Sequence, residues 1–160
     1  MQALMVRGAN DFGVENVEKP ECPPRGLLLR VHGCSLCGSD RRTLSIGHPK
    51  IDFPRIIGHE LSGTVVEVGP DYRGPWVEGD LIAVAPTVYC GECYFCRNNQ
   101  YELCENIKEL AKHWPGGFAE FMPIPEESIR NGPIEHVPGN LDPITAGIAE
   151  PVACCINAQE

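Results

Sequence analysis

GHELSGTVVEVG, residues 58–69, places a histidine and a glutamate directly before a strand-like run. From Gly63 onward apolar and polar residues alternate until a Gly-Pro pair, which predicts a β-strand over residues 60–70. Similar short runs bounded by glycine or proline predict five more strands, at residues 3–8, 26–34, 80–86, 117–125 and 133–138. Because 17 glycines and 15 prolines are spread along 160 residues, we expect one turn-rich, mostly β domain.

Composition and charge argue against several classes of protein. The net charge is −9 and no Lys/Arg-rich patch is present, so we expect no nucleic-acid partner. No apolar run reaches the roughly 18 residues of a membrane helix, so we expect no membrane partner. The opening segment, MQALMVRGANDFG, lacks the apolar centre of a secretory signal. The sequence therefore favours a protein of the cytoplasm.

Cysteine is over-represented, with nine residues, and an odd number fits a reducing compartment. Four of them, Cys90, Cys93, Cys96 and Cys104, follow the spacing C-x2-C-x2-C-x7-C. Four thiolates complete a tetrahedral zinc shell with no open position, which is typical of a structural site. An iron–sulfur cluster is the rival interpretation, and unrelated buried cysteines are the plainest one. We name residues 87–116 the cysteine lobe and expect a metal to organise it.

The C-terminal stretch, residues 142–160, has helix signals that the rest of the chain lacks. Asp142 can cap a helix whose first position is Pro143. Pro151 disfavours helical geometry at Glu150, which predicts a break there and a second helix opening at Pro151. We expect Cys154 and Cys155, in that second helix, to be buried packing residues. The prediction is a short helical exit from a β-rich body.

Chemistry at a metal needs an open site with mixed ligands, and two stretches offer one. CGSD at 37–40 follows a predicted strand, and His59 and Glu60 begin another. Taken alone, a single histidine is more often a satisfied surface or core residue, and Cys37 a small buried one. The ordered series of motifs favours the metal.

That series resembles the medium-chain dehydrogenase/reductase family, which includes the zinc alcohol dehydrogenases. The pattern G-H-E-x2-G-x5-G at 58–69 is similar to its zinc signature, and the quartet is similar to its structural-zinc lobe. The remaining motifs are CGSD at 37–40, VEGD at 77–80, GGFAEF at 116–121 and AEP at 149–151. The resemblance implies that residues 1–160 form the GroES-like catalytic domain, a partly open β-barrel with the cysteine lobe and helical exit.

The resemblance also implies roles for single residues. Cys37 and His59 would hold the catalytic zinc, with Glu150 as third ligand and Glu60 as an alternative ligand that replaces water or substrate. Ser39 would relay the proton from the substrate oxygen, although a serine after glycine also satisfies a turn. The implied activity is NAD(P)-dependent oxidation of a primary or secondary alcohol to a carbonyl, on a small alcohol, polyol or sugar.

Two positions depart from the family pattern. Arg42 and Thr43 stand where a histidine often passes the proton to solvent, and His48 is either a substitute for it or part of an exposed turn. Arg41 and Arg42 fit a polar, hydroxylated or phosphorylated substrate, but a solvated surface pair is the plainer interpretation.

The family binds its dinucleotide, NAD or NADP, on a Rossmann domain with a G-x-G-x-x-G turn, and no such turn occurs among these 160 residues. We therefore expect the chain by itself to bind zinc without turnover. Homo-oligomerisation stays open. A freestanding zinc-binding module with a scaffolding or partner-binding role is the alternative function. A zinc-free quinone reductase fits less well, because both metal motifs are present.

Overall fold

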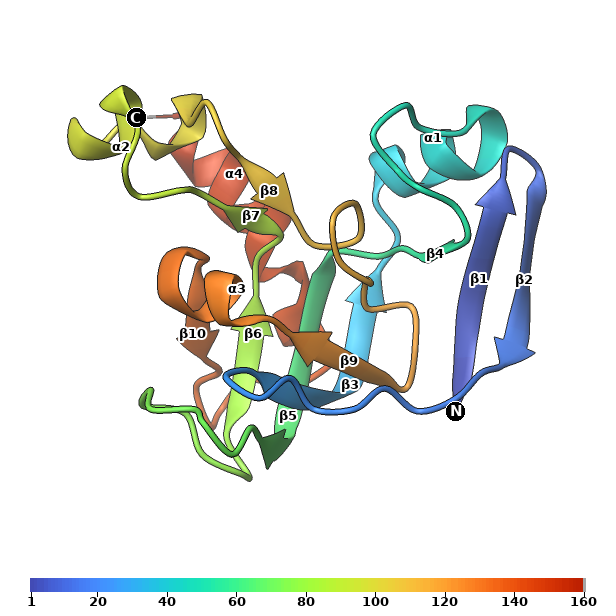
Figure 1. Ribbon diagram of the computed structural model, residues 1–160, viewed down its shortest axis with the longest axis horizontal. Coiled ribbons are helices and arrows are strands. Elements are labelled where there is room, and N and C mark those ends of the chain that lie inside the picture. Colours follow the sequence, from blue (N-terminus) through green and yellow to red (C-terminus); the bar gives the residue numbers. More distant parts are fainter. Residues whose placement is uncertain (160) are drawn as a thin grey trace.

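The computed structural model describes residues 1–159, whose strands form three separate antiparallel sheets (Figure 1). The central sheet has the order β10-β6-β5-β3-β9. Its strands are β3 (Leu27–Ser35), β5 (Glu60–Val68), β6 (Leu81–Val84), β9 (Phe121–Ile124) and β10 (Ile134–His136). The smaller sheets pair β1 (Gln2–Gly8) with β2 (Asp11–Asn16) and β4 (Arg55–Ile56), and β7 (Thr87–Val88) with β8 (Lys108–Glu109). The sheets do not close into one barrel, which confirms a mostly β, partly open body.

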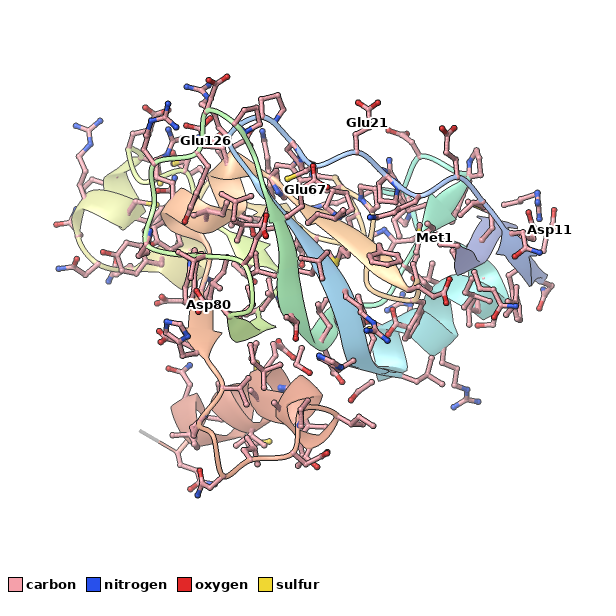
Figure 2. All side chains as sticks on the ribbon, turned by 90° about the horizontal axis from the view of Figure 1, so that it is seen from below. Met1, Asp11, Glu21, Glu67, Asp80 and Glu126 are labelled. Carbon is pink, nitrogen blue, oxygen red and sulfur yellow. The ribbon has the colours of Figure 1, made fainter. Side chains whose placement is uncertain are left out.

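The helices lie at the margins of this body. They are α1 (Gly38–Ile46), α2 (Tyr94–Arg97), α3 (Glu126–Asn131) and α4 (Ala149–Asn157), with 3-10 turns η1 (Tyr101–Leu103) and η2 (Thr145–Ile148). In Figure 1, α1 lies above the β1–β2 hairpin, while α2 lies at the far end of the molecule. Figure 2 shows β3 and β5 side by side across the molecule, with α4 below them. None of the described helices combines the length and apolar character required to cross a membrane.

The core forms around the ladder between β3 and β5. Leu29, Leu61 and Ile82 are at most 1% exposed and pack in one cluster from the three neighbouring strands. A second cluster of Val6, Ile51, Ile57 and Ala111 joins the three-stranded sheet to the segments beside it. The apolar residues that predicted strands in the sequence are therefore the ones that the sheets bury.

The six strands predicted from the sequence are all present, with most ends one to four residues shorter than predicted. The strand β2 was missed, although apolar residues alternate at Phe12 and Val14, because both side chains are exposed on an edge strand. The strands β4, β7 and β8 are two residues long, too short for any periodicity. The helix α1 was missed as well.

The prediction of a helix break at Glu150 was wrong. Both Glu150 and Pro151 lie inside α4, and the change of geometry occurs earlier, at Ile148. Pro151 is the third residue of α4, where a backbone N–H has no partner within the helix, so its absence costs little. The carboxylate of Asp142 does accept a backbone N–H, that of Thr145 at 2.8 Å, but the helical element η2 begins at Thr145 and not at Pro143.

The expectation for the two adjacent cysteines was also wrong. Cys154 and Cys155 are both exposed on α4. Cys34, by contrast, packs against the central cluster, and burial first and the charge of Asp40 second raise the pKa of its thiol to about 12. A thiolate is the reactive form of cysteine, so the two kinds of site differ in reactivity.

Replacement of Leu29 by alanine is expected to lower the free energy of unfolding by about 2–5 kcal/mol, because a fully buried leucine leaves a cavity. Val14→Ala is the matched control, since this side chain is 68% exposed, and it is expected to change stability by less than about 0.5 kcal/mol. Urea unfolding followed by circular dichroism measures both. Equal losses for the two variants would contradict the assigned core.

Iodoacetamide at pH 8 is expected to alkylate Cys155 at least about tenfold faster than Cys34 in the folded protein. The raised pKa keeps Cys34 protonated below about pH 12, so its rate is expected to keep rising above pH 10. Peptide mapping by mass spectrometry measures both rates. In the denatured chain the difference between the two alkylation rates should disappear. Rapid alkylation of Cys34 in the folded protein would refute its burial.

Candidate metal centres

The first candidate centre is built by the ladder that joins β3 to β5. Ser35, the last residue of β3, pairs with Glu60, the first residue of β5. Cys37 follows Ser35 by two positions and His59 immediately precedes Glu60, so the two segments meet at one end of the central sheet. Gly58 makes the turn possible, because its φ of +95° suits glycine and a Cβ would lie 2.8 Å from the Phe118 ring.

Three possible ligand atoms converge there. The sulfur of Cys37, a ring nitrogen of His59 and a carboxylate oxygen of Glu60 all lie within 4.8 Å of one another. Glu60 is 6% exposed, and within residues 1–159 it forms no salt bridge, which is rare for a buried carboxylate. A divalent cation would supply that partner, and the mixed sulfur, nitrogen and oxygen set is one that zinc accepts. The donor set therefore fits a zinc ion.

Asp40 holds this group together, and the sequence did not reveal its role. Its side chain is 3% exposed, with Oδ1 lying 3.4 Å from Nδ1 of His59. Its Oδ2 accepts the backbone N–H of Cys37 at 2.9 Å. Because Nδ1 faces this carboxylate, Nε2 is the nitrogen left for a metal. The spacing of an acid three residues after a helix cap was the available signal, since Cys37 caps α1.

The same contacts set the charge of His59 in the metal-free protein. Burial lowers the pKa of the imidazole, but the hydrogen bond and charge of Asp40, followed by those of Cys37, raise it to about 9. The imidazolium is therefore the favoured form at neutral pH. A metal ion that binds Nε2 must displace this proton.

A cavity of about 230 Å³ opens beside the group, and we name it the His59 cavity. Ser39, His59 and Glu150 face it. Ser39 Oγ lies 3.4 Å from Nε2 of His59, within reach of a hydrogen bond. Ile51, Ile57 and Leu110 form its apolar wall. Such a space can hold a small hydroxylated molecule next to a metal.

Glu150 is not part of the converging group. It lines the His59 cavity from α4, and its Oε1 accepts the thiol hydrogen of Cys154 at 3.3 Å. Glu60 therefore lies closer to Cys37 and His59 than Glu150 does in this conformation. The resemblance implied the reverse order, with Glu150 as the regular third ligand.

The second candidate centre is the cysteine quartet. The four sulfurs of Cys90, Cys93, Cys96 and Cys104 lie within 4.8 Å of one another, and those of Cys90 and Cys96 are 3.9 Å apart. Zinc–sulfur bonds of about 2.3 Å in a tetrahedron put sulfurs about 3.8 Å apart, so the quartet fits one zinc ion. An iron–sulfur cluster inserts several atoms between the thiolates and needs a wider opening.

Backbone N–H groups prepare the quartet for a cation. The N–H of Cys93 points at Sγ of Cys90 at 3.4 Å, and the N–H of Cys90 points at Sγ of Cys104 at 3.3 Å. The backbone N–H groups of Glu92 and Cys93 lower the pKa of Cys90 to about 6, because they stabilise its thiolate. The lobe backbone therefore favours the thiolate form of Cys90, the form that binds a metal.

Comparison with known proteins identifies the family of this chain. The profile of the alcohol dehydrogenase GroES-like domain matches residues 23–134. An L-threonine 3-dehydrogenase of Pyrococcus furiosus is 33% identical over 152 residues, which cover 92% of this chain and 42% of that protein. A sorbitol dehydrogenase of Halalkalibacterium halodurans is 35% identical over 164 residues, which cover 99% and 45%.

A solved structure from Sinorhizobium meliloti, described as a zinc-binding dehydrogenase bound to NADP, has a TM-score of 0.84 at 34% identity. The match covers 97% of this chain and 43% of that one, so the chain spans less than half the length of these relatives. The match extends over the central sheet, the cysteine lobe and the helical exit. The chain belongs to the family of alcohol dehydrogenase GroES-like domains, the catalytic domain of the medium-chain dehydrogenases.

Proposed function

We propose that this chain is the substrate- and zinc-binding part of an NAD(P)-dependent dehydrogenase that oxidises an alcohol, polyol or sugar hydroxyl to a carbonyl. The observation that carries the proposal is the convergence of Cys37, His59 and Glu60 beside a cavity. Relatives named as threonine and sorbitol dehydrogenases support it, because each of their substrates contains a secondary alcohol.

Cys37 and His59 Nε2 would hold the catalytic zinc, with Glu60 as carboxylate ligand in this conformation. Glu150 is the alternative carboxylate, since it faces the same cavity from α4. When bound, zinc supplies a Lewis acid that polarises the substrate oxygen, and the nicotinamide supplies a hydride acceptor. Exchange of Glu60 for Glu150 would replace one carboxylate by another, so the charge of the ligand set would be conserved.

Three features of the chain serve this chemistry. Ser39 Oγ accepts the proton of the substrate hydroxyl and passes it outward, since it borders both the His59 cavity and a second, open hollow. Asp40 fixes the tautomer and the orientation of His59. The apolar wall of the cavity excludes water, which strengthens the electrostatic interactions of the bound oxygen.

The four lobe cysteines would hold a second, structural zinc. The cysteine lobe buries few large apolar side chains, and Cys93, Cys96 and Cys104 form the centre of its small cluster. A structural zinc contributes roughly 10–16 kcal/mol of apparent binding free energy, enough to order such a segment. The zinc of the lobe thus has a structural role, and the Cys37 centre carries out the reaction.

A dinucleotide-binding domain is the partner that this proposal requires. The relatives are more than twice as long as the match, and the Sinorhizobium meliloti protein was solved with NADP. Oxidation of a panel of alcohols, polyols and sugars by the full-length protein, with NAD and NADP, tests the function. Failure to oxidise any of them with zinc bound would refute it. The 160-residue chain alone is expected to bind zinc without forming NAD(P)H.

Cys37→Ser and Cys93→Ser separate the two metals. Cys37→Ser is expected to lower zinc stoichiometry by one equivalent and oxidation by at least about a thousandfold, with little change in thermal stability. Cys93→Ser is expected to lower the melting temperature strongly, because the lobe loses its zinc. Metal analysis, calorimetry and steady-state rates measure the effects. If both variants lost stability alone, this division of roles would be wrong.

Asp40→Asn is expected to lower the zinc affinity of the Cys37 centre by about 10–100-fold, since the amide holds His59 less firmly. Competition with a coloured chelator measures the affinity, and the lobe zinc serves as an internal reference. Asp52→Asn, at an exposed position, is the matched control. An unchanged affinity in Asp40→Asn would show that the carboxylate does not position His59.

A further inference from the structure

Basic side chains stand where the His59 cavity meets a second hollow, on a chain whose net charge is −9. His48 and Lys112 line the cavity itself. Arg42 lines the second hollow, of about 600 Å³, which we name the outer hollow. Ser39 and His48 border both spaces, so the two are neighbours along one path. A substrate bound at the metal centre can therefore extend past Ser39 toward Arg42.

The acids around the cavity are already engaged. Asp40 lies against His59, and Glu150 accepts the thiol hydrogen of Cys154. Glu109 pairs with Lys112 at 2.5 Å. Within residues 1–159, by contrast, Arg42 forms no ion pair. No acidic side chain of the described residues lines the outer hollow, so Arg42 supplies the charge there.

His48 adds a donor of fixed orientation. Its Nδ1 accepts the backbone N–H of Lys50 at 3.1 Å, so the neutral ring carries its proton on Nε2. Burial and then the charge of Lys112 lower the pKa of His48, with smaller contributions from Lys50 and Arg42 against an opposing one from Glu109. Arg42 and His48 line the same outer hollow. An anion placed there would meet a guanidinium and a ring N–H.

We propose that Arg42 and His48 form an anion subsite at the mouth of the His59 cavity, which takes the terminal phosphate of a phosphorylated polyol or sugar. The inference rests on the proposed function, because the hydroxyl end of that substrate occupies the metal centre. A phosphate carries close to two charges and three acceptor oxygens, which matches the several donors.

Steady-state kinetics of the zinc-loaded full-length protein test the subsite with three substrates of equal chain length: a polyol, its terminal phosphate ester and the corresponding sugar acid. The KM of the phosphate ester is expected to be at least about tenfold lower than that of the polyol. Arg42→Gln is expected to remove this advantage, so that the KM of the ester rises to that of the polyol. Arg41→Gln is the matched control, since Arg41 lines a different hollow, beside Phe12.

Calorimetric titration with inorganic phosphate and with the ester, in the absence of NAD(P), separates this inference from the proposed function. Binding of both that Arg42→Gln weakens and Arg41→Gln does not supports the subsite, even if no substrate is oxidised. Oxidation of the polyol with no preference for the ester, and no phosphate binding, would overturn the subsite and leave the dehydrogenase standing. A sugar acid preferred over the ester would overturn the assignment to phosphate.

Discussion

The buried carboxylate of Asp40 joins the two halves of the Cys37 centre. One oxygen holds the backbone of Cys37 and the other faces His59, so residues twenty-two positions apart are fixed by a single side chain. A carboxylate that is 3% exposed is costly unless it is hydrogen-bonded and faces a positive charge, and both conditions are met here. The ladder between β3 and β5 brings the segments close, and Asp40 sets the distance between the ligand atoms.

The two candidate centres both contain cysteine sulfur, but one is closed and the other is open to a cavity. The lobe quartet offers four sulfurs and no open position, so a metal there stabilises a segment with little apolar core. The Cys37 centre offers mixed donor atoms beside a cavity, with Glu60 in the converging group and Glu150 on the cavity wall. Arg42 lines the outer hollow next to this cavity, where we propose that the charged end of a substrate binds.

Most of the fold could be predicted because the central strands bury one face and carry a clear alternation. The predictions failed where local preference competed with context. Proline at position 151 predicts a helix break. The first turn of α4 tolerates Pro151 because backbone N–H groups in that turn have no partner within the helix. Cys154 and Cys155 look like packing residues by type, but their burial depends on what covers α4, which the local sequence does not encode. The edge strand β2 was missed because its exposed apolar residues do not indicate that it pairs with another strand.

The sequence by itself determined the ligand types and their spacing: the four lobe cysteines, Cys37, His59 and the two glutamates. Spacing fixes which atoms can reach a metal when they lie on one turn or in one loop, as in the quartet. Only the tertiary structure decided that Glu60 lies with Cys37 and His59 while Glu150 is held by Cys154. It also decided that Asp40 bonds both segments and that Arg42 borders the route into the cavity. These relations depend on distances between segments far apart along the chain, which arise only when the strands pair.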